Sequence, residues 1–240
     1  MNVIAVTQKG LNKTENEDRI IVGKTIVAGG TLFSEIENGI IAVADGVGGH
    51  NAGAIASHFV ANKLCHLKEI SVELLRTIND ELIAISETTE GQKGMATTLS
   101  GICCTEGKPQ LFSIGNTRVY LLQSRKYLKQ LTTDDTTLNY LLATGQLAPE
   151  DADSFERKNE ITACFGGGSQ DLFKVKVTYI EPLAAPVMIT SDGIHDYLSV
   201  DQMEDIIEEH GLNEAACIEM IKLARNNGSL DDASIILGGV

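Results

Sequence analysis

The chain has few basic residues, few cysteines and no long apolar segment. Its 19 Lys and Arg stand against 33 Asp and Glu, which gives a net charge of −14. Nucleic acids and anionic membrane surfaces attract basic proteins, so this balance argues against both as partners. No apolar run reaches the length of a membrane span, and the N-terminus lacks the basic and apolar segments of a signal peptide. We therefore expect a cytoplasmic protein with no nucleic-acid or membrane partner.

The cysteines form neither a disulfide framework nor a zinc ligand pattern. They are odd in number and scattered, at Cys65, Cys103, Cys104, Cys164 and Cys217. Disulfide-rich folds and zinc sites use paired cysteines at characteristic spacings, which are missing here. Packing in the core is the interpretation for Cys103 and Cys104, which lie in an expected strand. A reducing compartment agrees with this pattern.

The apolar pattern predicts a single α+β domain over residues 1–240. A hydrophobic content of 43% supports a folded core, and there is no repeat, low-complexity tract or linker. Strands are expected at 2–7, 18–23, 97–104, 109–114, 118–123, 126–131, 173–180, 187–190 and 233–237, and helices at 52–67, 72–87, 200–209 and 213–226. We expect the first two strands to form a hairpin, 25–38 to be irregular, and the four strands from 97 to 131 to form a meander.

The segment from Ile40 to His50 organises the rest of the chain. Five apolar residues lead to Asp45, and a glycine-rich turn follows. Such a sequence predicts a buried strand that ends on a carboxylate beside accessible backbone. A carboxylate held in this way is a natural ligand for a hard cation, although an Asp-Gly turn alone is equally typical of a simple strand-to-helix connection.

Three further strands carry acidic residues at one end. Asp192 follows the apolar run at 187–190, Asp231 and Asp232 precede the run at 233–237, and Glu17 and Asp18 precede the run at 19–22. If these four strand ends converge, their carboxylates repel one another unless cations are present. The recurrence favours a metal site over an isolated turn.

Several short motifs occur in a fixed order along almost the whole chain. They are Asn16-Glu17-Asp18, Asp45-Gly46-Val47-Gly48-Gly49-His50, Gly94-Met95-Ala96-Thr97-Thr98, Gly115-Asn116-Thr117-Arg118, Leu131-Thr132-Thr133-Asp134, Ser191-Asp192-Gly193 and Asp231-Asp232. This set resembles the bacterial PPM-type (type 2C) metal-dependent serine/threonine protein phosphatases. Several motifs in order are far more specific than any one of them.

The resemblance implies a fold and a reaction. The fold is a four-layer αββα sandwich, with two antiparallel sheets flanked by helix pairs and a flap subdomain at about 134–160. The reaction is hydrolysis of phosphoserine and phosphothreonine on proteins by attack of a metal-activated water on phosphorus. The partners are phosphorylated proteins, the substrates of a serine/threonine kinase.

The resemblance also assigns the site residues. Two Mn²⁺ or Mg²⁺ ions are expected, with the catalytic carboxylates of Asp45, Asp192 and Asp231 as their ligands. Asp45 bridges both ions, and the carbonyl oxygen of Gly46 binds one of them. Glu17 and Asp18 support the cluster through ordered waters. Oxygen ligands of this kind select hard cations over soft ones.

The chain departs from the family pattern at two positions. Lys13 stands where the family usually has an arginine that grips the substrate phosphate, and lysine keeps the charge without the forked geometry. Asn116 stands where the family usually has an aspartate linked to a third metal ion, so we expect that ion to be weak or absent. Asp232 either adds a ligand oxygen or hydrogen-bonds the turn, and His50 is expected to order its own turn.

Two alternatives to an active protein phosphatase remain open. The departures at Lys13 and Asn116 suggest a catalytically weak or inactive phosphatase-fold regulatory module that binds phosphoproteins. The carboxylates of Asp45, Asp192 and Asp231 argue for catalysis, because a binding module has no need of a self-repelling cluster. A metal-dependent hydrolase of small phosphoesters shares the same motifs.

Overall fold

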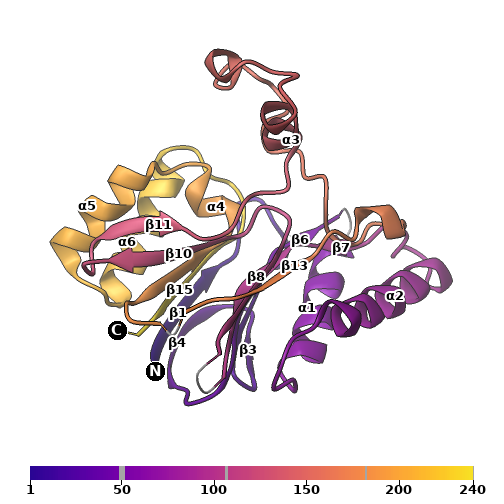
Figure 1. The fold of residues 1–240 in the computed structure, drawn as a ribbon, viewed down its shortest axis with the longest axis horizontal. Coiled ribbons are helices and arrows are strands. Elements are labelled where there is room, and N and C mark those ends of the chain that lie inside the picture. The colour runs from indigo at the N-terminus through magenta and orange to yellow at the C-terminus, as the bar shows by residue number, and fades with distance from the viewer. Residues whose placement is uncertain (49–51, 106–107, 182, 240) are drawn as a thin grey trace.

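Two six-stranded antiparallel sheets pack face to face (Figure 1). The computed structural model describes residues 1–48, 52–105, 108–181 and 183–239, so His50 lies outside the described residues. The first sheet has the order β11 (Tyr127–Gln130), β10 (Arg118–Gln123), β14 (Val187–Thr190), β15 (Ala233–Gly238), β1 (Asn2–Gln8) and β4 (Gly30–Glu35). The second has the order β13 (Lys176–Tyr179), β9 (Gln110–Ile114), β8 (Leu99–Cys104), β5 (Gly39–Ala44), β2 (Arg19–Val22) and β3 (Thr25–Val27).

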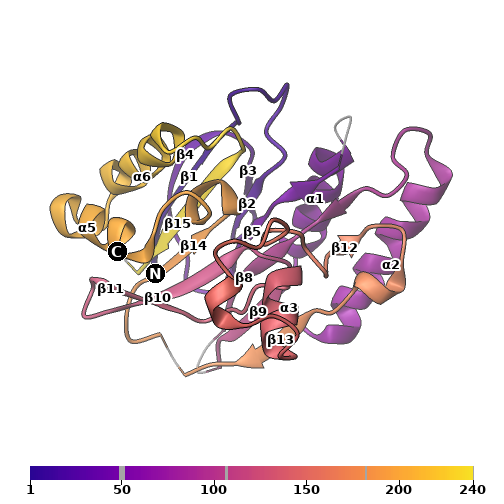
Figure 2. The same cartoon turned by 90° about the horizontal axis from the view of Figure 1, so that it is seen from above.

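A helix pair covers the outer face of each sheet, as Figure 2 shows from above. The pair on the second sheet is α1 (Ala52–Leu64) and α2 (Val72–Thr88), and the pair on the first is α5 (Val200–His210) and α6 (Glu214–Asn226). Polar caps fix where three of these helices begin: Ser71, Ser199 and Asn213 each accept a hydrogen bond from a backbone N–H of the first turn. The predicted four-layer αββα sandwich is confirmed.

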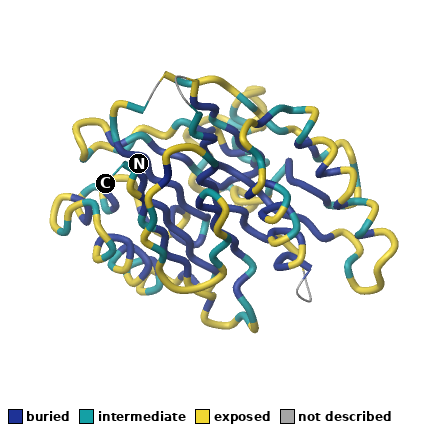
Figure 3. The backbone as a smooth tube through the Cα atoms, turned by 90° about the horizontal axis from the view of Figure 1, so that it is seen from below, coloured by how far each residue is buried: buried dark blue, intermediate teal, exposed yellow. Residues whose placement is uncertain are grey.

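Three apolar clusters fill the three interfaces between these layers. Phe112 and Leu82 belong to the cluster under α1 and α2, and Met203 and Met220 to the one under α5 and α6. The sheets themselves meet across a third cluster that includes Ile236. Figure 3 shows buried segments running through the middle of the molecule and exposed segments around its outside. Strands packed from both faces are rigid, so side chains at their ends have fixed positions.

The predicted pairing of the first two strands is wrong. β1 pairs with β15 and β4 in the first sheet, whereas β2 pairs with β3 and β5 in the second. The segment 25–38, expected to be irregular, supplies β3 and β4. Apolar periodicity locates a strand but does not name its partner, and here the chain passes to the other sheet between β1 and β2.

The predicted meander is also wrong at its centre. β8 pairs with β9 and β10 pairs with β11, but these hairpins lie in different sheets. The crossing occurs at Gly115, whose φ of +93° suits glycine. A Cβ on Gly115 would lie 2.6 Å from the Thr98 side chain, so the turn is also closely packed.

Residues 134–160 leave the sandwich and project beyond the sheets (Figure 1). This segment holds α3 (Thr137–Ala143) and the short 3₁₀ helix η1 (Pro149–Asp151), and neither has a buried residue. A small third sheet has the order β12 (Phe165–Gly166), β7 (Ala96–Thr97) and β6 (Gly46–Val47). In the part of the chain that the structure describes, no helix combines the length and apolarity needed to cross a bilayer.

Candidate active site

Both sheets contribute acidic residues to one end of the sandwich. Asp45 follows β5, and Asp18 precedes β2, which is its neighbour in the second sheet. Asp192 begins the short helix α4 (Asp192–His195) after β14, and Asp231 stands just before β15, the neighbour of β14 in the first sheet. The expected convergence of strand-end carboxylates is therefore present.

The carboxylates act strongly on one another. Burial raises the pKa of Asp45 well above its usual value, and the charges of Asp192, Asp18 and Asp231 raise it further. A hydrogen bond between the carboxyl groups of Asp45 and Asp192 contributes in the same direction for Asp45. Burial and the charge of Asp231 also raise the pKa of Asp192. A cluster of this kind resists ionisation until positive charge is added.

Asp18 is fully buried and only half satisfied. The Ser234 hydroxyl donates to its Oδ2 at 2.7 Å, while its Oδ1 has no hydrogen-bond partner among the described residues. Burial, together with the charges of Asp232 and Asp192, raises its pKa to about 7. A buried carboxylate oxygen without a partner is costly, which is the situation that a bound cation or its water ligands relieve.

Glycines allow the backbone segments around the cluster to approach closely. A Cβ on Gly46 would lie 2.3 Å from the Gly53 carbonyl oxygen, and one on Gly193 would lie 1.9 Å from that of Asp232. The Gly46 N–H donates to the Glu17 carbonyl at 3.2 Å. The glycines of the two Asp-Gly motifs are therefore required by packing, in addition to any role of the Gly46 carbonyl.

Lys13 is the counter-ion of the cluster's outer part. Its Nζ lies 2.9 Å from Glu17 Oε2, 2.5 Å from Asp231 Oδ1 and 3.0 Å from Asp232 Oδ2. Burial lowers the pKa of Lys13, but the hydrogen bonds to these carboxylates outweigh burial and the net effect is a raised pKa. The residue expected to face substrate phosphate thus lies among the acidic residues expected to hold metal.

Asp232 fixes the backbone around the site. Its Oδ1 accepts from the Gly10 N–H and its Oδ2 from the Glu17 N–H, both at 2.7 Å. It thereby ties the loop between β1 and β2 to the start of β15. These are the hydrogen bonds expected of a residue that orders the turn.

Asn116 lies against Asp192 at the flap side of the site. Its Nδ2 donates to Asp192 Oδ2 at 3.0 Å. Next to it is a polar pocket of about 210 Å³, which Arg118, Asp134 and Asn139 help to line. The pocket therefore joins the carboxylate cluster to the projecting segment.

Sequence reasoning missed two contacts that shape the site. Ser234, one of the partners of Asp18, gave no motif signal. The two-point ion pair between Arg118 and Asp134, with Nη2 to Oδ2 at 2.7 Å, holds the start of the projecting segment against β10. Arg118 and Asp134 each end one of the motifs quoted above. Their opposite charges were the sequence signal from which this ion pair could have been predicted.

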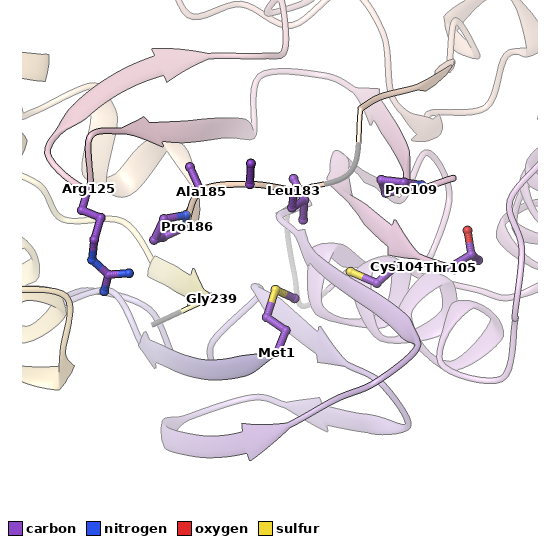
Figure 4. Close-up of a pocket in the computed structure, with 10 residues that line it drawn as sticks. Met1, Cys104, Thr105, Pro109, Arg125, Leu183, Ala185, Pro186 and Gly239 are labelled. Atoms are coloured by element: carbon purple, nitrogen blue, oxygen red, sulfur yellow. The ribbon is translucent and has the colours of Figure 1, made fainter. Parts of the chain in front are cut away.

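A second pocket lies far from the carboxylates. It has a volume of about 360 Å³ and is lined by Met1, Leu183, Pro186 and Gly239, among others (Figure 4). Met1 and Gly239 adjoin the ends of β1 and β15 opposite to those that carry the acidic residues. This pocket is not part of the candidate site.

The donor set fits hard divalent cations. The side chains predicted to bind metal are all carboxylates, Asp18 Oδ1 has no hydrogen-bond partner among the described residues, and the Lys13 ammonium shows that a cation is accepted among them. Within the described ranges, no three acidic, histidine or cysteine side chains surround one point as a preformed metal site would. Two of the acidic side chains, Glu17 and Asp231, instead contact the Lys13 ammonium.

Comparison with known proteins identifies the family. No protein-family model matches the chain. The serine/threonine phosphatase Stp of Listeria monocytogenes serotype 4b is 30% identical over 96% of this chain and 92% of its own length. The chain belongs to the bacterial PPM-type serine/threonine phosphatases. The family predicted from the ordered motifs is confirmed.

Solved structures agree with this assignment. The Mycobacterium tuberculosis serine/threonine phosphatase PstP/Ppp matches with a TM-score of 0.80 and 27% identity, over 99% of this chain and 98% of that one. A second PstP structure, of the catalytic domain in complex with two manganese ions, matches with a TM-score of 0.76 and 28% identity over 99% and 98%. The fold and the family are thus supported over almost the whole PPM-type chain.

Proposed function

We propose that this chain is a protein phosphatase that hydrolyses phosphoserine and phosphothreonine on proteins, using two Mn²⁺ or Mg²⁺ ions. The observation that carries the proposal is the convergence of Asp45, Asp192, Asp231 and Asp18 from both sheets, where burial and then the charges of the other three raise the pKa of Asp45. A self-repelling cluster at the end of a rigid sandwich is of use when cations bind there. The manganese ions in the PstP structure support the same stoichiometry.

Each residue of the cluster has a distinct task. Asp45 is influenced by the charges of Asp192, Asp18 and Asp231 and would bind both ions, with the Gly46 carbonyl as a further ligand of one. Asp192 and Asp231 complete the ligands from the first sheet. Glu17 and Asp18 support the ions through waters, and the unsatisfied Oδ1 of Asp18 is available for this. When bound, the ions activate a water and stabilise charge on the phosphoryl oxygens.

Two residues tune the site without carrying the chemistry. Asn116 orients Asp192 by donating to its Oδ2 and offers at most a neutral oxygen to a third ion, which we expect to be weak or absent. Bound divalent cations would compete with Lys13 for the oxygens of Glu17 and Asp231. An ammonium freed in this way would have the charge to contact the substrate phosphate.

The Lys13 contacts favour a second candidate function. An ammonium held by three carboxylates would also stabilise a cluster that no longer binds metal, as in a regulatory module that binds phosphoproteins without hydrolysing them. The raised pKa of Asp45 argues for the enzyme, because burial and the charges of Asp192, Asp18 and Asp231 keep it well above its usual value with Lys13 present. With either function, the protein would meet its phosphorylated partners, the products of a serine/threonine kinase, in the cytoplasm.

Metal binding and substrate preference test the proposal together. Calorimetric titration with Mn²⁺ should give two ions per wild-type chain, loss of binding in Asp45→Asn and no change in Asp153→Asn, an exposed acid of the projecting segment. Hydrolysis of a phosphothreonine peptide in preference to an aryl phosphate would favour a protein phosphatase over a hydrolase of small phosphoesters. Equal Mn²⁺ binding by wild type and Asp45→Asn would overturn the ligand assignment.

A further inference from the structure

Two exposed leucines stand at the edge of the carboxylate cluster. Leu11 is 64% exposed and Leu230 is 52% exposed. The Leu11 N–H donates to the Leu230 carbonyl at 3.1 Å, and a Cβ on Gly10 would lie 2.5 Å from the same oxygen. Leu11 precedes Lys13 by two residues, and Leu230 immediately precedes Asp231. The leucines are therefore held side by side, next to residues of the proposed metal site.

The two loops that carry these leucines are firmly connected. The Gly10 N–H donates to Asp232 Oδ1 at 2.7 Å. The Arg225 guanidinium, from the last turn of α6, donates to the carbonyl oxygens of both Lys9 and Asp231. A surface fixed in this way loses little conformational freedom when it binds a partner. The leucines thus form a preorganised surface.

Tyr197 adds an aromatic ring to the same edge. It is 37% exposed, and its carbonyl accepts from Asn227 Nδ2 at 2.8 Å, at the end of α6. Burial raises the pKa of its phenol, as do the charges of Asp196, Asp231 and Asp192. The hydrogen bond from Asn227 fixes Tyr197 at the end of α6, where the loop that carries Leu230 begins.

We infer that Leu11, Leu230 and Tyr197 form an apolar ledge that binds an apolar side chain next to the phosphorylated residue of a protein substrate. This inference rests on the proposed function. The ledge adjoins the metal site directly, and a peptide whose phosphate is held there must extend across its edge. Exposed apolar side chains gathered beside a polar site are typical of interaction surfaces.

The charge of the chain favours an apolar occupant over a charged one. With a net charge of −14, the surface repels acidic flanking residues. A basic flanking residue would find no free carboxylate in Glu17 or Asp231, because Lys13 or the bound ions take up their oxygens. An apolar side chain gains from burial against the leucines and disturbs neither the ion pairs nor the ions. A second copy of this chain is the alternative occupant, and the test below separates it.

The test compares two phosphothreonine peptides that differ only in flanking residues, Leu in one and Asn in the other. The readout is the ratio of their kcat/KM values with Mn²⁺, for wild type, Leu11→Ser/Leu230→Ser and the control Phe33→Ser. Phe33 is an equally exposed apolar residue, 62% accessible, on the edge strand β4. Leu11→Ala alone serves as a milder variant if the double variant folds poorly.

We expect wild type to favour the Leu peptide by about tenfold, the scale of a modest apolar contact in a binding site. The ratio should fall to near one in the double variant and stay at the wild-type value in Phe33→Ser. A wild-type ratio of one, or a ratio unchanged by the double variant, would overturn the ledge. A shift from dimer to monomer in the double variant, with no change in ratio, would assign the surface to self-association instead.

Failure of the proposed function gives a different result. If folded wild-type protein releases no phosphate from either peptide with Mn²⁺ or Mg²⁺, the phosphatase assignment fails. Fluorescence anisotropy then measures the affinity of the protein for the same two peptides, labelled with a fluorophore. This tests the ledge by binding alone. Tighter binding of the Leu peptide, lost in Leu11→Ser/Leu230→Ser, would support the ledge, and equal binding of both peptides would overturn it.

Discussion

Asn116 Nδ2 lies 3.0 Å from Asp192 Oδ2, so an amide takes up part of a carboxylate that the proposed metal site needs. The contact lowers the pKa of Asp192, against burial and the charge of Asp231, which raise it. Asn116 thus stabilises the ionised cluster in the absence of metal. The residue at position 116 therefore affects both the stability of the metal-free protein and the number of ions that the site can bind.

Replacing Asn116 with aspartate should make the protein more dependent on metal. Asn116→Asp removes the donated hydrogen bond and adds a negative charge beside Asp192, which should cost about 1–3 kcal/mol of unfolding free energy in chelator. With Mn²⁺ the loss should shrink, because the added carboxylate becomes a ligand. Urea unfolding in chelator and in Mn²⁺ measures both effects. Equal midpoints for wild type and variant in chelator would contradict the role given to Asn116.

Lys13→Ala should destabilise the metal-free protein more than the metal-bound one. Its ammonium pairs with three carboxylates, so its removal should lower the unfolding free energy in chelator by about 2 kcal/mol. Bound Mn²⁺ should replace much of this effect, while KM for a phosphopeptide should rise. The matched control Lys13→Arg keeps the charge. A loss of stability that is the same with and without Mn²⁺ would show that Lys13 and the ions do not share oxygens.

His195 should make the protein less stable in mild acid. It is buried, its Nδ1 lies 2.8 Å from Thr190 Oγ1, and its Nε2 has no hydrogen-bond partner among the described residues. Burial first, and then the charge of Arg118, lower its pKa well below 6.5. The unfolded chain therefore takes up a proton below about pH 6.5 that the folded protein does not, and stability falls as the pH falls.

His195→Gln should remove this part of the pH dependence. The acidic residues whose pKa values are raised act in the opposite direction, but they are the same in both proteins and cancel in the comparison. Urea midpoints at pH 7.5, 6 and 5 should show the variant gaining on wild type as the pH is lowered. A constant difference between the two proteins across this range would contradict a neutral, buried His195.

Arg118→Lys should loosen the projecting segment. Arg118 donates from Nε and Nη2 to Asp134 Oδ2, at 2.9 and 2.7 Å, and lysine cannot reproduce this two-point contact. We expect a loss of about 1–2 kcal/mol and faster chymotrypsin cleavage after Phe155. Arg157→Lys is the control, because Arg157 lies in the same segment and is largely exposed. Equal cleavage of both variants would show that the ion pair does not hold the segment.

The strand-end carboxylates were predictable because their signal is local. Asp45 and Asp192 each follow an unbroken apolar run, and Asp231 precedes one, so each run marks a strand and its acidic end. Ordered motifs then indicated the family and its four layers. The α4 turn after Asp192 was too short for a periodic signal.

No local sequence signal predicts which sheet a strand joins, or which residues Lys13 contacts. β1 and β2 are both buried strands, and nothing in their sequences shows that the chain changes sheets between them. The contacts of Lys13 join the first loop of the chain to the start of its last strand. Only the assembled fold shows that Asp231 and Asp232 lie within reach of this ammonium.

Phosphate release from a phosphothreonine peptide by wild type and Asp45→Ala, with Mn²⁺, with Mg²⁺ and with chelator, tests the catalytic assignment most directly. We expect metal-dependent release by wild type, none in chelator, and a loss of at least a hundredfold in folded Asp45→Ala, about the scale of removing one group that stabilises the transition state. Release by Asp45→Ala at the wild-type rate, or by wild type in chelator, would contradict it.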